Sequence, residues 1–158
     1  MNNVEIERKF LVKSDFWKGL VQESFIIKQG YFPGDGRIVT SRVRLSGKKA
    51  FLTIKGPSVG LSRSEFEYEI PSKDAIQMLD EYCKKEKIEK VRSLVRCGNH
   101  LWEIDEFEGE NYPLVIAEVE LKSEDEVFEF PDWLGNEVTR DARYLNVNLI
   151  QNPYSAWK

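Results

Sequence analysis

Charged and apolar side chains alternate along residues 4–11, near the start of the chain. Successive side chains of a β-strand point to opposite faces, so an extended stretch with this pattern has one charged face and one apolar face. The charged face consists of Glu5, Glu7 and Lys9, and the apolar face consists of Val4, Ile6 and Phe10. The pattern therefore predicts a strand whose charged face needs its own polar surroundings.

The same alternation occurs in three later stretches, and the sign of the charge differs between them. Arginines alternate with apolar residues in 41–45, whereas glutamates do so in 64–70 and in 117–121. Each strand taken alone is compatible with an ordinary sheet that has one solvated face. A solvated face usually mixes both signs with uncharged polar residues, however, and these faces carry mainly one sign each. The set as a whole favours a shared, charged interior.

Length and composition indicate a single globular domain over residues 1–158. The chain has 158 residues, and its 41% hydrophobic content argues against disorder. No apolar run reaches the roughly 18 to 20 residues of a membrane span, and a charged strand stands where a signal peptide would be apolar. We therefore expect a cytoplasmic protein that contacts no membrane. Cys83 and Cys97 are too few for a disulfide framework or a zinc site.

Eight strands and three helical segments are expected from periodicity and turn residues. The strands are 4–12, 25–32, 38–46, 50–56, 62–70, 90–96, 100–107 and 114–122. Glycines in 46–49 and 97–100 predict hairpin turns. Ser72 and Ser14 are candidate N-caps for helices over 73–85 and 14–20, and Thr139 is a candidate cap for a C-terminal helix.

The fold class expected is α+β, mainly antiparallel β. A closed eight-stranded barrel would turn the charged faces inward, around a tunnel, and leave the apolar faces outside for the helices to cover. An unpaired buried ion costs several kcal/mol, so such a lining has to be hydrated and cross-paired. The mixture of acids and bases also predicts a ligand that brings both negative charge and cations.

The charged residues divide into two chemical sets. Carboxylate oxygens suit Mg²⁺ or Mn²⁺, and Mg²⁺ is commonly held by one or two carboxylates together with substrate phosphates. Arginine binds phosphate oxygens in pairs, and lysine adds a compact charge. The inward acids are Glu5, Glu7, Glu65, Glu67, Glu69, Asp105, Glu118 and Glu120. The inward bases are Lys9, Arg42, Arg44, Lys55, Lys90 and Arg92, with Arg63 close to a loop. No P-loop and no Ser-His-Asp arrangement accompanies them.

In sequence order, these motifs resemble the CYTH superfamily, the triphosphate tunnel metalloenzymes. The resemblance starts at Glu5-Ile6-Glu7-Arg8-Lys9, which is similar to the ExExK signature, and covers nearly the whole chain. It continues through Arg42-Val43-Arg44, Leu52-Thr53-Ile54-Lys55, the glutamates of 65–69, Lys90-Val91-Arg92, Trp102-Glu103-Ile104-Asp105-Glu106-Phe107 and Ala117-Glu118-Val119-Glu120-Leu121. The stretch 137–144 is similar to the small bacterial members, which tend to be inorganic tripolyphosphatases.

The resemblance implies a role for each of these residues. The implied metal ligands are Glu5, Glu7, Glu118 and Glu120, assisted by Asp105 and one glutamate of 65–69, for which we favour Glu67. The implied phosphate ligands are Lys9, Arg42, Arg44, Lys55, Arg63, Lys90 and Arg92. Glu5, Glu7, Lys9 and Lys90 are the candidates for a catalytic role. Tyr31 either approaches the tunnel or packs outside it as a core aromatic residue.

The expected activity is metal-dependent hydrolysis of tripolyphosphate to pyrophosphate and phosphate. Three alternatives stay open: an adenylate cyclase of the CYTH type, a thiamine or nucleoside triphosphatase, and a polyphosphate-binding module without activity. The expected partner is a small polyphosphate rather than a nucleic acid, in keeping with a net charge of −4. The sequence leaves the oligomeric state open, a homodimer included.

Overall fold

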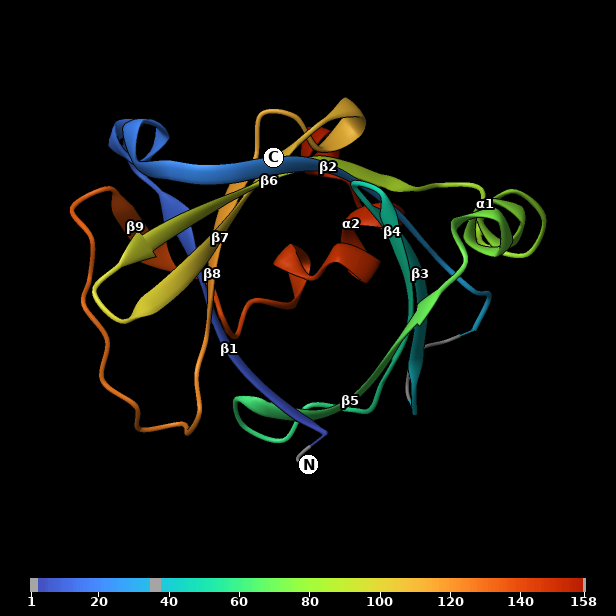
Figure 1. Cartoon of the computed structure of the whole chain (residues 1–158), viewed down its shortest axis with the longest axis horizontal. Coiled ribbons are helices and arrows are strands. Elements are labelled where there is room, and N and C mark those ends of the chain that lie inside the picture. Colours follow the sequence, from blue (N-terminus) through green and yellow to red (C-terminus); the bar gives the residue numbers. More distant parts are fainter. Residues whose placement is uncertain (1–2, 35–37, 158) are drawn as a thin grey trace.

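A computed structural model describes residues 3–34 and 38–157, and it contains the predicted closed barrel (Figure 1). Neighbouring strands are antiparallel, in the order β5-β4-β3-β2-β6-β7-β8-β1, and β1 closes the barrel by pairing with β5. The strands are β1 Val4–Val12, β2 Val21–Tyr31, β3 Thr40–Ser46, β4 Lys49–Lys55, β5 Ser62–Ile70, β6 Ile88–Cys97, β7 His100–Phe107, β8 Val115–Glu120 and β9 Leu134–Glu137.

Strand β1 holds the barrel together because it pairs with three other strands. Residues 4–6 pair with β5, residues 7–11 pair with β8, and Phe10 and Val12 pair with β9. The ninth strand was not predicted. It is only four residues long and contains Gly135, so it lacks the alternation that marks a strand. Gly135 also lies against the backbone of Leu11, where a Cβ atom would come within 3.0 Å of the carbonyl oxygen.

Both predicted hairpin turns are present. Gly47 joins β3 to β4 with φ +58°, and Gly98 joins β6 to β7 with the same φ of +58°. Glycine reaches this left-handed conformation without the penalty that a Cβ atom imposes. Because the two hairpins are short, they also fix the register of the strands that carry Arg42, Arg44, Lys90 and Arg92.

The hydrophobic core lies outside the barrel, between the strands and the segments that cover them. One cluster places Phe10 and Trp102 against Phe128 and Trp133 of the long segment after β8. A second packs Val43 and Ala50 beneath helix α1, Ser72–Glu81. A third is covered by the C-terminal residues, which include helix α2, Asn146–Gln151. Figure 1 shows α1 beside β3 and β4, on the outside of the barrel.

The N-cap residues predicted for the three helical segments were wrong. Ser72 is the first residue of α1, and its hydroxyl donates to the Lys48 carbonyl instead of capping the helix. The helix predicted over 14–20 is the 3-10 turn Phe16–Leu20, and its N-cap Asp15 makes no side-chain cap.

The C-terminal helix is divided between the 3-10 turn Ala142–Tyr144 and α2. Asp141 caps the turn by accepting from the Arg143 amide. Thr139 does not cap it, because its hydroxyl oxygen accepts from the Lys9 backbone amide of β1 at 3.0 Å. No helix in the described residues 3–34 and 38–157 is long and apolar enough to cross a membrane.

A fully buried ion cluster fastens β6 to β7 inside the barrel wall. Asp105 has no exposed surface, and its two carboxylate oxygens accept from Arg92 at 2.7 and 2.8 Å and from Lys90 at 2.7 Å. Burial acts to raise the pKa of Asp105, but Arg92 and Lys90 outweigh it and hold the pKa well below its ordinary value. The cluster therefore stabilises the fold only while Asp105 is ionised.

We expect Asp105→Asn to destabilise the protein by about 3–5 kcal/mol, because the amide removes the ion-pair partner of buried Lys90 and the bidentate partner of Arg92. Urea unfolding at pH 7 measures the loss. By linkage, the stabilisation in the parent protein is complete above the ordinary pKa of 3.8 and disappears as the pH falls through the lower value of the folded state.

Asp80→Asn is the matched control, since Asp80 is exposed on α1 and has no ion pair among the residues that the structure describes. A loss for Asp105→Asn within about 0.5 kcal/mol of this control would contradict the structural role of the cluster.

Candidate active site

The barrel encloses a cavity of about 200 Å³ whose lining is strongly charged. Seven glutamates and seven cationic side chains line it, and they come from seven of the strands around the barrel. Every inward acid and base predicted from the sequence lines this cavity except Glu69 and Asp105, and Asp105 lies behind the lining in the buried cluster. The glutamates are Glu5, Glu7, Glu65, Glu67, Glu103, Glu118 and Glu120, and the cations are Lys9, Arg42, Arg44, Lys55, Arg63, Lys90 and Arg92.

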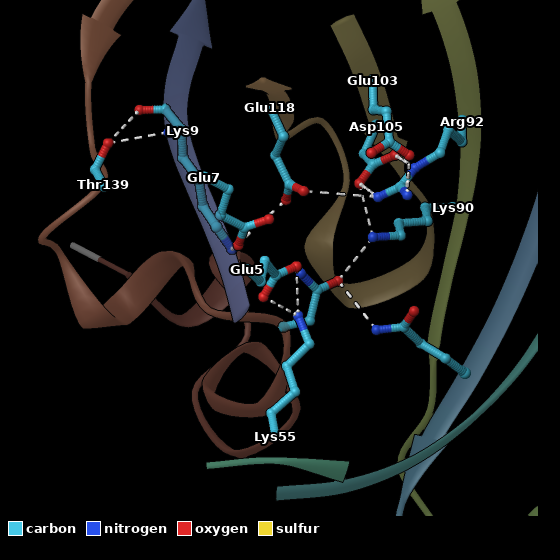
Figure 2. A network of polar contacts seen from close by, with 12 residues as sticks. Glu5, Glu7, Lys9, Lys55, Lys90, Arg92, Glu103, Asp105, Glu118 and Thr139 are labelled. Atoms are coloured by element: carbon cyan, nitrogen blue, oxygen red, sulfur yellow. Dashed lines mark hydrogen bonds and ion pairs between the residues drawn. The ribbon is translucent and has the colours of Figure 1, made fainter. Parts of the chain in front are cut away.

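Strand register brings the acids and bases of neighbouring strands together. Glu7 lies opposite Glu120, and Lys9 lies opposite Glu118, in the β1–β8 pairing. Lys9 Nζ lies 3.4 Å from Glu7 and 3.5 Å from Glu118 (Figure 2). Burial alone would lower the pKa of Lys9, but Glu118, Glu7 and Glu5 outweigh it and raise the pKa above its ordinary value. Lys9 is therefore a permanent cation inside the tunnel.

Lys55 joins the acids of two strands at the closure of the barrel. Its Nζ lies 2.7 Å from a carboxylate oxygen of Glu5 on β1 and 3.0 Å from one of Glu65 on β5. Figure 2 shows the side chains of Glu5 and Lys55 pointing toward one another. The ion pair lies where β1 and β5 meet, so the same residues that line the site also close the barrel.

The glutamate strand β5 contributes two of its three acids to the tunnel. Glu67 accepts from Thr53 at 2.8 Å and from Arg42 at 3.4 Å, and Glu65 pairs with Lys55. Glu69 was expected to face inward, but it does not line the cavity and instead lies 3.6 Å from Lys49. It lies opposite Phe51, one residue before the end of β5.

Arg44 differs from most of the other cations because its described partner is uncharged, as is the Gly56 carbonyl that accepts from Arg63. Its Nε donates to the Gln29 side-chain oxygen at 2.9 Å, and no carboxylate among the described residues lies within ion-pair distance. Burial and the nearby charges of Arg42 and Arg92 lower the pKa of Arg44 to about 10. Arg44 therefore remains charged at neutral pH and supplies positive potential that the protein leaves unbalanced.

Lys90 and Arg92 extend this positive side from strand β6. Lys90 is almost fully buried, and burial lowers its pKa to about 8 although Asp105 acts in the opposite direction. Arg92 forms an ion pair with Glu103 in addition to Asp105. Glu103 was missed in the sequence analysis. It lies two residues before Asp105 on β7, so the alternation of a strand places both on the same face and could have identified it. Its side chain is 34% exposed and lines the cavity.

The carboxylates of β1 and β8 are suited to a divalent cation. Burial raises the pKa of Glu120, and the charges of Glu5, Glu103 and Glu65 add to the shift. A hard divalent ion relieves this repulsion and prefers such oxygens. Within the described residues, no three acidic, histidine or cysteine side chains already stand together at the spacing of a metal centre. The donor chemistry fits a metal, and the candidate ligands are Glu5, Glu7, Glu67, Glu118 and Glu120.

Two further parts of the chain reach the tunnel. Tyr31 belongs to an outer core cluster and also lines the cavity, so both readings of this residue are partly correct. Residues 145–147, at the start of α2, line the cavity as well. No sequence pattern indicated the second contribution, because it depends on how the C-terminal segment folds back onto the barrel.

Comparisons with known proteins agree with this geometry. The model of the CYTH domain matches residues 3–154. An inorganic triphosphatase from Acetivibrio thermocellus is 49% identical over 154 residues, 98% of this chain and 97% of that protein. One from Nitrosomonas europaea is 38% identical over 148 residues, 92% of this chain and 95% of that protein.

Among solved structures, a crystal structure of an inorganic triphosphatase superposes with a TM-score of 0.67 at 34% identity and covers 92% of this chain and 93% of that one. Residues 3–154, which match the CYTH domain model, include all nine strands and the whole tunnel lining. The chain belongs to the CYTH domain family.

Proposed function

We propose that this protein hydrolyses inorganic tripolyphosphate to pyrophosphate and phosphate with the help of a divalent cation, Mg²⁺ or Mn²⁺. The observation that carries the proposal is the tunnel itself, in which carboxylates of β1 and β8 face an arginine and lysine wall from β3 and β6. Relatives that match almost the full length of the chain are inorganic triphosphatases, which supports the same substrate.

The cationic wall explains how a chain of phosphates is held. Arg42 and Arg44 project from the same face of β3, two residues apart, so their guanidinium groups lie at successive levels of the tunnel. Lys90 and Arg92 do the same from β6. Arginine forks match phosphate oxygens, and groups positioned before the substrate arrives lose little freedom on binding. Successive phosphates are thereby fixed along the tunnel.

A bound divalent cation would neutralise phosphate charge and acidify a water molecule. Glu5, Glu7, Glu118 and Glu120 would hold it, together with Glu67. Lys9 lies between Glu7 and Glu118, so it fixes these two carboxylates and keeps its own proton. The arginines stabilise the charge that develops on the phosphate oxygens when the bond to the leaving group breaks. No covalent enzyme intermediate is needed.

The lining favours an inorganic substrate over a nucleotide. Tyr31 is the one aromatic side chain among the described residues that line the cavity. A cyclase of ATP has to position the ribose and benefits from contacts to the base, and stacking of a base on an aromatic side chain usually supplies such contacts. A module that only binds polyphosphate would gain nothing from seven glutamates facing an anion. Hydrolysis uses both halves of the lining.

A substrate panel with product identification tests the proposal. We expect kcat/KM for tripolyphosphate to exceed that for ATP and for thiamine triphosphate, because the organic group adds bulk without adding contacts. The products are separated by anion-exchange chromatography, with EDTA as the control that removes activity. A preference for ATP with cyclic AMP as product would establish the cyclase instead, and undiminished turnover in EDTA would refute the metal requirement.

We expect Arg44→Ala to lower kcat/KM by similar factors for tripolyphosphate and ATP, since the lost contact is with phosphates that both contain. A charged hydrogen bond of about 1.5–3 kcal/mol corresponds to a loss of roughly tenfold to a hundredfold. Steady-state kinetics on both substrates gives the two factors. Arg96→Ala is the matched control, because Arg96 is exposed on β6 and does not line the tunnel. Equal rates for the Arg44 and Arg96 variants would show that Arg44 does not bind substrate.

We expect Glu120→Gln to abolish turnover while raising the Tm of the metal-free protein. An acid whose pKa is raised in the folded state costs stability as the pH rises above its ordinary value of 4.5. The amide removes this cost, so the gain in Tm appears at pH 7 and vanishes near pH 4. Calorimetry in EDTA at both pH values measures it. A variant that keeps the parental rate with Mg²⁺ would remove Glu120 from the metal site.

A further inference from the structure

Gln29 is a buried, uncharged amide in the wall of a barrel whose cavity is lined mainly by charged side chains. It lies on β2 directly opposite Arg44 of β3, and no part of it is exposed. Its side-chain oxygen accepts from Arg44 Nε at 2.9 Å, and its amide nitrogen donates to the Tyr31 hydroxyl at 3.0 Å. It does not line the cavity, so it acts on the tunnel only through the residues that it contacts.

A second amide fixes the orientation of the first. The Gln29 amide nitrogen also lies 3.4 Å from the side-chain oxygen of Asn146, the first residue of α2. The same Asn146 oxygen accepts from Lys90 Nζ at 3.0 Å. Turning the Gln29 amide over would place its NH₂ group against the N–H of Arg44, donor against donor. The acceptor that Arg44 meets is therefore set by these hydrogen bonds.

Arg44 differs from most of the inward cations, and Arg63, whose Nε donates to the Gly56 carbonyl oxygen at 3.2 Å, is the other one held by a neutral oxygen in the described residues. Lys55 meets Glu5, Lys9 meets Glu118, and Arg92 meets Asp105, each through a carboxylate. A carboxylate in place of the Gln29 amide would hold the guanidinium in the same direction, but it would cancel the positive charge. A neutral oxygen orients Arg44 and leaves its charge available to an anion.

We propose that Gln29, held in turn by Asn146, is a positioning residue that aims Arg44 at the substrate without neutralising it. The inference rests on the proposed binding of triphosphate by Arg44. It assigns a function to two uncharged residues, one of which comes from the C-terminal helix. The tunnel thereby obtains a cation whose charge is balanced by the ligand and by no side chain within ion-pair distance among the described residues.

The decisive variant is Gln29→Glu, which keeps the shape of the side chain and adds one negative charge. Binding of tripolyphosphate to the metal-free protein in EDTA is measured by calorimetry, so that no catalytic step is involved. We expect Kd to rise by about tenfold or more, the effect of losing one charge-assisted hydrogen bond to phosphate. Gln22→Glu makes the same chemical change on an exposed position of β2 and should leave Kd unchanged. Parental binding by Gln29→Glu would overturn the proposal.

Coupling to Arg44 is tested by the double variant. In the Arg44→Ala background we expect Gln29→Glu to raise Kd by a much smaller factor. A fully buried carboxylic acid without a cationic partner stays protonated, and no Arg44 charge is left for it to neutralise. If Gln29→Glu raised Kd by the same factor in both backgrounds, the Gln29 amide would not act through Arg44, and the positioning role would be rejected. Thermal unfolding of each variant separates a loss of binding from a loss of fold.

If Gln29→Glu does not fold, Gln29→Met serves in its place, because it keeps the length of the side chain and removes the oxygen that accepts from Arg44 Nε. Its control is Gln22→Met, at the exposed position of β2. We again expect weaker tripolyphosphate binding, and binding equal to the control would overturn the proposal. A parent protein that binds tripolyphosphate without hydrolysing it refutes the proposed function alone. Normal hydrolysis with unaffected variants refutes only the positioning role.

Discussion

Ions enclosed by a small barrel have to be matched in sign, because an unpaired buried ion costs several kcal/mol and a whole domain is stable by only about 5 to 15 kcal/mol. This protein lines its cavity with seven glutamates and seven cations. The matching runs between strands: Lys55 joins β1 to β5, and Asp105 joins β6 to β7 through Lys90 and Arg92. The ion pairs that offset the cost of enclosing charges in the cavity therefore also hold the barrel closed.

The matching is incomplete at Arg44 and at Glu120, and these two residues attract opposite kinds of ligand. Arg44 is held by a neutral amide and keeps its charge, whereas Glu120 is surrounded by like charges that raise its pKa. An anion relieves the first imbalance and a cation relieves the second. A polyphosphate with its metal ion supplies both together, so the resting electrostatics of the tunnel are complementary to the substrate that we propose.

The position of the core follows from the same constraint. With the charged faces turned inward, the apolar faces point outward and need cover, which α1, the segment after β8 and the C-terminal residues provide. Covering the barrel from outside also brings the start of α2 to the tunnel, where Asn146 contacts Lys90. A segment needed to bury hydrophobic surface thus becomes part of the site.

Alternation with a period of two determined which face each strand turns inward, because this property is local and is written in the sequence. It was enough to identify the barrel and to place Glu5, Lys9, Arg42 and Arg44 in the tunnel. Tertiary structure alone decided which of Glu65, Glu67 and Glu69 reach the cavity, that Glu103 lines it while Asp105 lies behind it, and that Gln29 meets Arg44 and Asn146. Those outcomes depend on register, barrel closure and contacts between residues more than a hundred positions apart, which no local pattern contains.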